Sequence, residues 1–130
     1  MDKGKIKLNT RWLDSYNAVF DISGEVSSAA ENQLTEAYNL ATSAGAKRII
    51  FNFTDLEYMN SSGIGLLVTL LIRAQRQNQQ LLAFGLNKHY TQIFELTRLN
   101  EAIEIYPDEL DVLGIIEKRK LGDVDAKLSA

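Results

Sequence analysis

The sequence predicts a single α/β domain built on a mixed, mostly parallel β-sheet. A chain of 130 residues with 45% hydrophobic and 24% charged residues is long and apolar enough to form one compact core. Nearly continuous apolar runs at residues 48–53 and 81–86 are typical of strands that are covered on both faces. Helical patterns with short links separate the predicted strands, so we expect right-handed crossovers between parallel strands. The predicted order is β-β-α-β-α-β-α-β-α.

The first third of the chain predicts a hairpin followed by a helix. Polar and apolar residues alternate over residues 5–12, and a second strand-like run covers residues 18–23 after a turn at 14–17. These two strands are expected to pair antiparallel. The segment from Ser28 to Glu31 has the spacing of a capping box, and apolar residues then recur at helical spacing until Gly45 supplies a stop.

The middle of the chain continues the alternation of strands and helices. The strand at 48–53 is expected at the centre of the sheet, followed by a helix from Ser62 to about Asn78 and a buried strand at 81–86. A third helix is expected from Lys88 to about Leu99, and a final edge strand at 103–106.

The end of the chain predicts a last helix and a tail. Pro107, which is followed by two acidic residues, is well placed to open a helix that runs through Ile116. Beyond the charged run that follows, the chain has little apolar surface to bury. We therefore expect one domain over residues 1–117 and a flexible C-terminal tail over residues 118–130.

Charge and composition exclude several classes of function. The net charge is −3 and the basic residues are scattered, so the basic stripe of a nucleic-acid-binding protein is missing. The absence of cysteine removes disulfides, thiolate catalysis and most structural zinc sites. The first residues lack the apolar segment of a secretory signal, and the stretch from Ile64 to Ile72 is about half as long as a membrane span. We expect a cytoplasmic protein that neither binds nucleic acid directly nor inserts into a membrane.

The sequence predicts neither an enzyme nor a cofactor site. The segment Gly63 to Gly65 begins a dinucleotide fingerprint, but the third glycine and the later acidic residue are absent. His89 is the only histidine, and no nucleophile elbow surrounds Ser61, so neither serine hydrolase chemistry nor a metal site is supported. We interpret Asp55 and Glu57 as solvated loop residues rather than as a general acid and base.

The turn at residues 58–65 is the most informative part of the sequence. Ser61 and Ser62 stand directly before an apolar helix, where the first N–H groups lack partners and the local potential is positive. A serine there can cap the helix, and an added phosphate could be held at the same place. From the residues alone, a capping role and an exposed functional hydroxyl both remain open for these two serines.

The helix that follows the serines carries more apolar surface than a helix packed on a small sheet normally has to bury. One stripe is expected to face inward and consists of Ile64, Leu67, Val68 and Leu71. A neighbouring row at spacings of three and four residues consists of Leu66, Thr69, Leu70 and Arg73. This second row either lies buried against the preceding helix or forms an exposed patch for a protein partner beside the serines.

Two segments, residues 20–26 and 55–65, resemble the STAS domain of bacterial anti-sigma factor antagonists. They read F-D-I-S-G-E-V and D-L-E-Y-M-N-S-S-G-I-G, and the resemblance extends over about residues 5–116. It implies a small α/β sandwich in which the first serine of the S-S-G turn is phosphorylated by a partner serine kinase that is also the anti-sigma factor. On that resemblance Ser61, rather than Ser62, is the phosphoacceptor. The unmodified protein would bind the kinase and so release a sigma factor, and a serine phosphatase would reverse the modification.

Two residues depart from the pattern of the family. Asn60 replaces the aspartate usual before S-S-G, and Ser27 replaces an aspartate that commonly follows G-E. These departures keep two alternatives open: a scaffold subunit of a signalling complex, or a cytosolic regulatory subunit of a transporter. A nucleotide sensor at the serine turn is a third. The interpretation adopted is a phosphorylation-controlled protein-binding switch without catalytic residues, metal or cofactor, whose partner-binding residues are Asn60, Ser61, Ser62, Gly63, Leu66, Thr69, Leu70 and Arg73.

Overall fold

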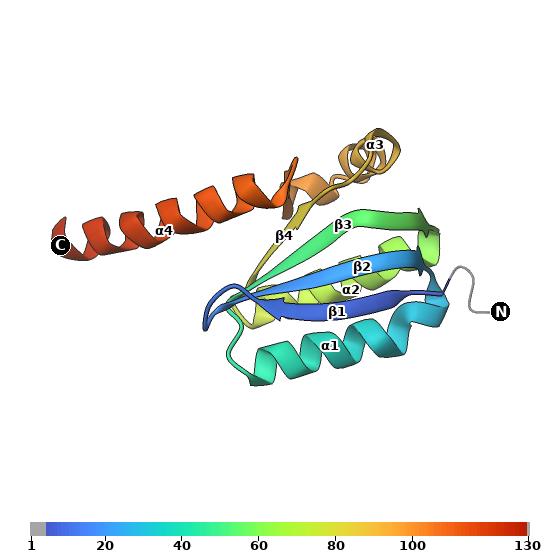
Figure 1. The fold of residues 1–130 in the computed structure, drawn as a ribbon, viewed down its shortest axis with the longest axis horizontal. Coiled ribbons are helices and arrows are strands. Elements are labelled where there is room, and N and C mark those ends of the chain that lie inside the picture. Colours follow the sequence, from blue (N-terminus) through green and yellow to red (C-terminus); the bar gives the residue numbers. More distant parts are fainter. Residues whose placement is uncertain (1–4, 130) are drawn as a thin grey trace.

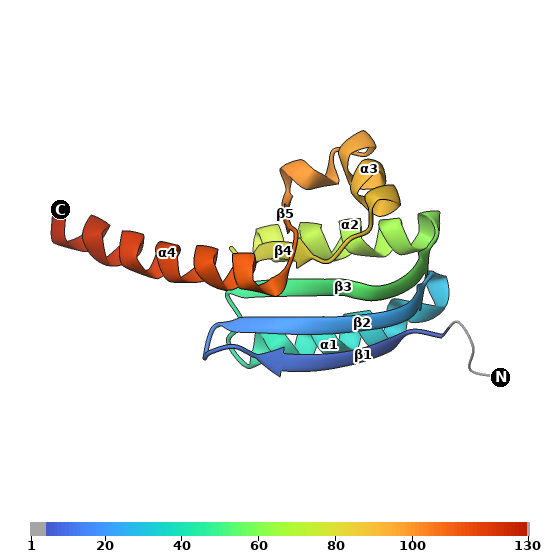
Figure 2. The ribbon, with the colours of Figure 1, turned by 45° about the horizontal axis from the view of Figure 1, so that its top comes forward.

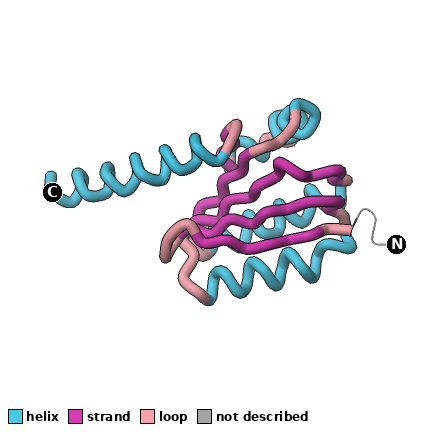
Figure 3. Tube along the Cα trace, viewed as in Figure 1, coloured by secondary structure: helices cyan, strands magenta, loops and turns pink. Residues whose placement is uncertain are grey.

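The computed structural model describes the backbone of residues 5–129 and the side chains of residues 5–120. Within these residues, five strands form one sheet in the order β1-β2-β3-β4-β5, in which only the β1–β2 pair is antiparallel (Figures 1 and 3). The predicted mixed, mostly parallel α/β fold and its element order are confirmed. The strands are β1 (Lys7–Trp12), β2 (Asn17–Val26), β3 (Arg48–Met59), β4 (Gln80–Phe84) and β5 (Ile103–Tyr106). The helices are α1 (Glu31–Ser43), α2 (Ser61–Arg76), α3 (Lys88–Leu96) and α4 (Glu109–Ser129), with short 3₁₀ turns at Ser28–Ala30 and Leu99–Glu101.

One face of the sheet packs against α1, α2 and α3. Phe20, Phe51 and Phe53 form a row of aromatic contacts on this face, with ring centroids 5.9 and 5.6 Å apart, and Phe94 of α3 continues the row. The two crossover helices α1 and α2 run in the same direction along the sheet (Figure 1), because each connects two parallel strands. Their buried side chains complete this larger core: Leu34, Ala37, Tyr38, Ala41, Leu67, Leu70 and Ala74.

The opposite face of the sheet packs against α4. Because successive strand residues point to opposite faces, Val19, Ile50 and Leu82 turn away from the larger core. They form a second, smaller core with Val112 and Ile116 of α4. The strands β2, β3 and β4 are therefore covered on both sides, which agrees with their nearly continuous apolar sequences.

The last helix, α4, is longer than predicted. It starts two residues after Pro107, as expected, but the prediction that it ends at Ile116 is wrong because it continues to Ser129. Ion pairs of Arg119 and Lys120 with side chains outside α4 fix the turn that follows Ile116. Beyond that turn the helix projects past the sheet (Figure 2).

Parts of the predicted domain organisation fall on residues 1–4 and 130, which lie outside the described residues. The division into a domain over residues 1–117 and a flexible tail over residues 118–130 stays a prediction. Where the backbone is described, up to Ser129, this tail is helical.

The start of α1 differs from the predicted capping box. Ser27, not Ser28, caps the segment, because its hydroxyl accepts the N–H of Ala29 at 3.3 Å and opens a 3₁₀ turn. The helix proper begins at Glu31 without a side-chain cap. The predicted stop is confirmed: Gly45 lies just beyond the helix with φ of 100°, a conformation that glycine adopts at little cost.

The strands β2 and β3 end at the same edge of the sheet and so bring two loops together. They pair in parallel from Asn17 and Arg48 to Val26 and Met59, with two register shifts on the way. Directly after this last pair, the N–H of Asn60 donates to the carbonyl of Val26 at 3.3 Å. The serine turn is thus attached to the end of β2, next to the segment that leads into α1.

Candidate partner-binding site at the serine turn

Asn60 supplies the cap of α2. Its backbone is extended, and its side-chain Oδ1 accepts the N–H of Gly63 at 2.9 Å. The helix therefore does not need a serine as its cap. The amide of Asn60 performs this task as well as the aspartate of the family pattern could, because both residues present a side-chain oxygen.

Ser61 and Ser62 are the first two residues of α2, and both are exposed. Within the described part of the chain, neither hydroxyl has a hydrogen-bond partner. Of the two roles that the sequence left open, capping is thus excluded and an exposed hydroxyl remains. The first N–H groups of α2 lie next to these hydroxyls, which makes the surroundings favourable to negative charge.

The two glycines of the turn have different tasks. A Cβ on Gly63 would lie 2.1 Å from the carbonyl oxygen of Val26 and 2.9 Å from the side chain of Met59, so only glycine lets α2 start this close to β2. A Cβ on Gly65 would meet nothing within 4 Å. Gly63 therefore positions the serines, whereas Gly65 leaves the surface beside them low and open.

An exposed row on α2 continues from Ser61. At 100° per residue, Ser61, Gly65, Val68 and Ile72 project within about 60° of one another. All four are exposed, and the apolar members Val68 and Ile72 keep 37% and 45% of their surface accessible. The sequence prediction that Val68 faces inward is wrong, because the buried side of α2 is centred on Leu67 instead. We call these four residues the Ser61 row.

The row predicted from the sequence to bind a partner lies on another side of α2 and consists of Leu66, Thr69, Leu70 and Arg73. Leu70 is only 3% exposed and belongs to the larger core, so it offers almost no surface to a partner. Leu66 is partly buried, and Thr69 and Arg73 are exposed. All four line a groove between α1 and α2. For Leu70 the structure thus agrees with burial against the preceding helix, and the partner-binding role predicted for Leu66, Thr69 and Arg73 stays a prediction.

The surroundings of the turn contain one residue that the sequence did not single out. Tyr90, in the first turn of α3, is buried, and its hydroxyl accepts the N–H of Met59 at 2.9 Å. It therefore holds the end of β3 from the side opposite to β2. The helix start that positions this tyrosine is capped by Asn87, whose side chain accepts the N–H of Tyr90. His89 is exposed beside Tyr90.

The carboxylates before the serines were assigned to the wrong element. Asp55 and Glu57 lie within β3, not in a loop, because β3 pairs with β2 as far as Met59. Both are exposed, and they stand six and four residues before Ser61. Tyr58, which pairs with Glu25 of β2, is 50% exposed and adds an aromatic surface close to the turn.

The surroundings of the two serine hydroxyls bear on both catalysis and metal binding. The hydroxyls of Ser61 and Ser62 have neither a base nor an acid as hydrogen-bond partner among the described residues. No group of three or more histidine, cysteine or acidic residues in the described part of the chain could hold a metal ion. None of the described helices combines the length and the apolar character needed to cross a bilayer.

The fold and this surface define a small protein-interaction module in which a rigid helix start presents two hydroxyls next to an apolar row. The chain belongs to the STAS domain family, whose model matches residues 9–112.

Two kinds of comparison agree with this family. The chain is 26% identical over 109 residues to the anti-sigma-B factor antagonist of Listeria monocytogenes, and the match covers 84% of this chain and 96% of that protein. Its fold is similar to that of an anti-sigma factor antagonist from Mycobacterium paratuberculosis, with a TM-score of 0.75 and 17% identity over 88% of this chain and 96% of the other. The phosphorylated form of SpoIIAA, a Bacillus cell fate determinant, has a TM-score of 0.67 and 18% identity over 84% of this chain and 99% of the other.

Proposed function

We propose that this chain is an anti-sigma factor antagonist, a protein-binding switch in transcription control that is reset by phosphorylation of Ser61. In its unmodified form it binds an anti-sigma factor that is also a serine kinase, and a sigma factor is released. A serine phosphatase acting on phospho-Ser61 restores binding. The observation that carries the proposal is the exposed hydroxyl of Ser61, which has no partner among the described residues and stands in line with Gly65, Val68 and Ile72.

The choice of Ser61 over Ser62 rests on the Ser61 row. Ser62 is one residue further along the helix and projects about 100° away from Ser61. A kinase that docks on Val68 and Ile72 would therefore face Ser61 more directly. The family pattern, in which the first serine of S-S-G accepts the phosphate, favours the same residue.

A phosphate at Ser61 would act mainly on the partner. It adds about −1.5 to −2 charges and considerable bulk at the edge of a partly apolar surface. In the free protein the N-terminus of α2 offsets part of this charge. In a complex the phosphate would have to be desolvated, and a penalty on the order of 3 kcal/mol would weaken binding more than a hundredfold. The phosphorylated SpoIIAA structure is consistent with a fold that accommodates such a phosphate.

The neutral Asn60 supports a switch despite the departure from the family pattern. It keeps the cap on Gly63, so the serines are presented at a well-formed helix start. It also places no carboxylate directly before Ser61, and like-charge repulsion against a phosphate is correspondingly smaller. The presentation of Ser61 therefore does not depend on the missing aspartate.

The proposal is tested by identifying the partner and the modified residue together. The wild-type protein serves as bait in extracts of the source organism, and the recovered kinase is then incubated with ATP and the bait. Site-resolved mass spectrometry should find phosphate on Ser61 in the wild type and in Ser62→Ala, and none in Ser61→Ala. Recovery of a transporter or of a large signalling assembly without a kinase would favour the alternative roles, and labelling of Ser62 alone would overturn the assignment.

A further inference from the structure

A groove between α1 and α2 remains outside the proposed switch. It has a volume of about 460 Å³ and lies about a third of a turn around α2 from the Ser61 row. Its lining includes the buried Leu34 and Leu70, the partly buried Leu66 and the exposed Leu40, which keeps 65% of its surface accessible. The apolar surface that the groove leaves open therefore comes mainly from Leu40 of α1 and Leu66 of α2, above a floor formed by the buried leucines.

The groove is long enough for a helix. A second hollow shares Asn39, Ser43 and Arg73 with it and continues to Arg76 near the end of α2. From Glu31 to Ser43 the groove follows about 18 Å of α1, at 1.5 Å per residue, which corresponds to three helical turns.

The charges along the groove are separated by sign. The charged residues of α1 are Glu31 and Glu36, both in its first half, and those of α2 are Arg73 and Arg76, both in its last turn. Because the two helices run in the same direction, one end of the groove is acidic and the other end is basic (Figure 1). None of the four side chains forms an ion pair with another described residue.

This charge pattern specifies both the kind of occupant and its direction. Helices favour acidic residues in their first turn and basic residues in their last turn, because of the helix macrodipole. Such a helix matches the groove only when its start lies at the Arg73 and Arg76 end and its last turn lies near Glu31 and Glu36. It then runs antiparallel to α1 and α2, which also opposes its dipole to theirs.

We infer that the groove between α1 and α2 binds an amphipathic helix of a protein partner, antiparallel to both helices, with an acidic first turn, an apolar side and a basic last turn. Arg73 and Arg76 would interact favourably with the dipole of α2 on any side of its last turn. Both nevertheless lie along the groove and the hollow that continues it. Among the described residues, the one hydrogen bond that these arginines form with α1 is a long one, from Arg73 to Asn39 at 3.4 Å, which an incoming carboxylate can replace. The inference does not depend on phosphorylation of Ser61.

The test uses two synthetic peptides and the full chain labelled with ¹⁵N. Both peptides are helices of about 14 residues with leucines at i, i+4 and i+7. One has glutamates in its first turn and lysines in its last, and the other has these charges exchanged. The first peptide should shift the amide signals of Leu40, Thr69 and Arg73, and should bind about tenfold more tightly than the second. High salt should reduce this difference.

Two matched variants locate the binding site. Leu40→Glu should abolish the shifts caused by the first peptide, whereas Leu96→Glu on α3, where the leucine is 84% exposed, should leave them unchanged. Ser61→Asp should also leave them unchanged, which separates this inference from the proposed switch. Absence of shifts at the groove, equal affinity for both peptides, or unaltered binding by Leu40→Glu would each overturn the inference.

Discussion

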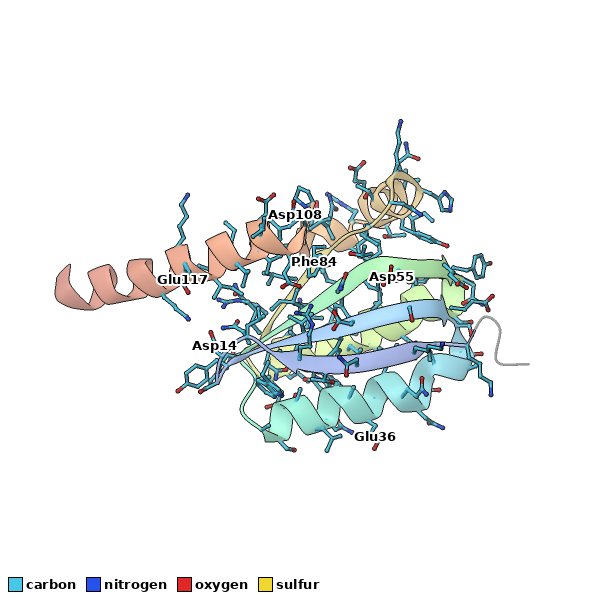
Figure 4. All side chains as sticks on the ribbon, in the orientation of Figure 1. Asp14, Glu36, Asp55, Phe84, Asp108 and Glu117 are labelled. Carbon is cyan, nitrogen blue, oxygen red and sulfur yellow. The ribbon has the colours of Figure 1, made fainter. Side chains whose placement is uncertain are left out.

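The two ends of the parallel strands differ in how their polar groups are satisfied. At the amino ends, side chains from β2, β3, β4 and α4 form one chain of hydrogen bonds and ion pairs. At the carboxyl ends, by contrast, the two serine hydroxyls at the start of α2 are exposed without partners in the described residues, and the Ser61 row continues from them along α2. Figure 4 shows this separation along the sheet: Asp14 lies at the hairpin turn and Asp55 towards the other end of β3.

The network at the amino ends is dense. Asp14 accepts hydrogen bonds from the backbone N–H groups of Tyr16 and Asn17, both at 2.8 Å, and pairs with Lys120 of α4. Arg48 then connects Asn17 to Gln80, with donor–acceptor distances of 2.8 and 2.9 Å. These contacts fix the hairpin, the sheet and α4 relative to one another.

The difference between the two ends of the strands indicates that residues important for stability and residues important for partner binding lie in separate parts of the domain. Side chains that have partners within the chain hold the fold, whereas those at the serine turn can change partner or charge without disturbing it. The carboxyl edge is also where loops of parallel α/β sheets commonly bind ligands. We therefore expect substitutions at the amino ends to act on folding and substitutions in the Ser61 row to act on binding.

The largest contrast in stability is expected between substitutions of Leu70 and Val68, which lie on different sides of α2. Leu70→Asp places a charge in the larger core and should reduce the free energy of unfolding by more than about 4 kcal/mol. Val68→Asp, on the Ser61 row, should cost about 1 kcal/mol or less but weaken kinase binding at least tenfold. Urea unfolding and titration calorimetry measure the two effects. Similar stability of both variants would mean that the sides of α2 are assigned wrongly.

The two glycines of the turn provide a second, smaller contrast. Gly63→Ala should lower the free energy of unfolding by about 2–3 kcal/mol, because its Cβ would collide with the backbone of Val26. Gly65→Ala has open space around it and should raise helix stability by about 0.5–1 kcal/mol. Thermal unfolding of both variants distinguishes them. Equal melting temperatures would contradict the role given to Gly63.

In the network at the amino ends, the carboxylate of Asp14 should contribute about 1–2 kcal/mol to the free energy of unfolding, and this contribution should depend on pH. Partial burial raises the pKa of Asp14, but hydrogen bonds from Tyr16, Asn17 and Lys120 outweigh it and hold the pKa at about 2, below the ordinary 3.8. A carboxylate with a lowered pKa stabilises the fold above its unfolded pKa, and this contribution is lost as the pH falls from about 4 to about 2.

The variant Asp14→Asn removes the carboxylate charge and keeps a similar shape. At pH 7 its free energy of unfolding should be about 1–2 kcal/mol lower than that of the wild type, and the difference should disappear near pH 2. Unfolding curves recorded across this range measure it. A difference that stays constant with pH would show that the charge of Asp14 contributes nothing to stability.

The sequence predicted much of the fold because the signals of single elements are local. Apolar runs identified the strands that α-helices cover on both faces, and Gly45 ended α1 where expected. The predicted end of the strand at residue 53 was too early, because residues 54–59 extend β3 by pairing with β2 and not by any apolar pattern of their own. The length of α4 was missed for a similar reason, since the contacts of Arg119 and Lys120 are distant in sequence.

The serine turn was also found from the sequence, but its surface was not. Adjacent serines before an apolar helix are visible in the sequence, and so is Asn60 as a possible cap. Which side of α2 is exposed depends on where α1 packs, and this cannot be read from an apolar pattern that covers most of the helix. Leu70 was for that reason considered for a partner surface, whereas Val68 was placed in the core.

The most direct test of the Ser61 row as the switch surface is the affinity of the kinase for four forms of the protein. These are the wild type, Ser61→Ala, Ser61→Asp and the wild type phosphorylated on Ser61, with Ser62→Asp as the matched control. Alanine should bind like the wild type, aspartate should weaken binding in part because it carries about one charge, and phosphate should weaken it more than a hundredfold. Ser62→Asp should have a smaller effect than Ser61→Asp. Equal affinity of all five proteins would contradict the account, because the turn would then lie outside the interface.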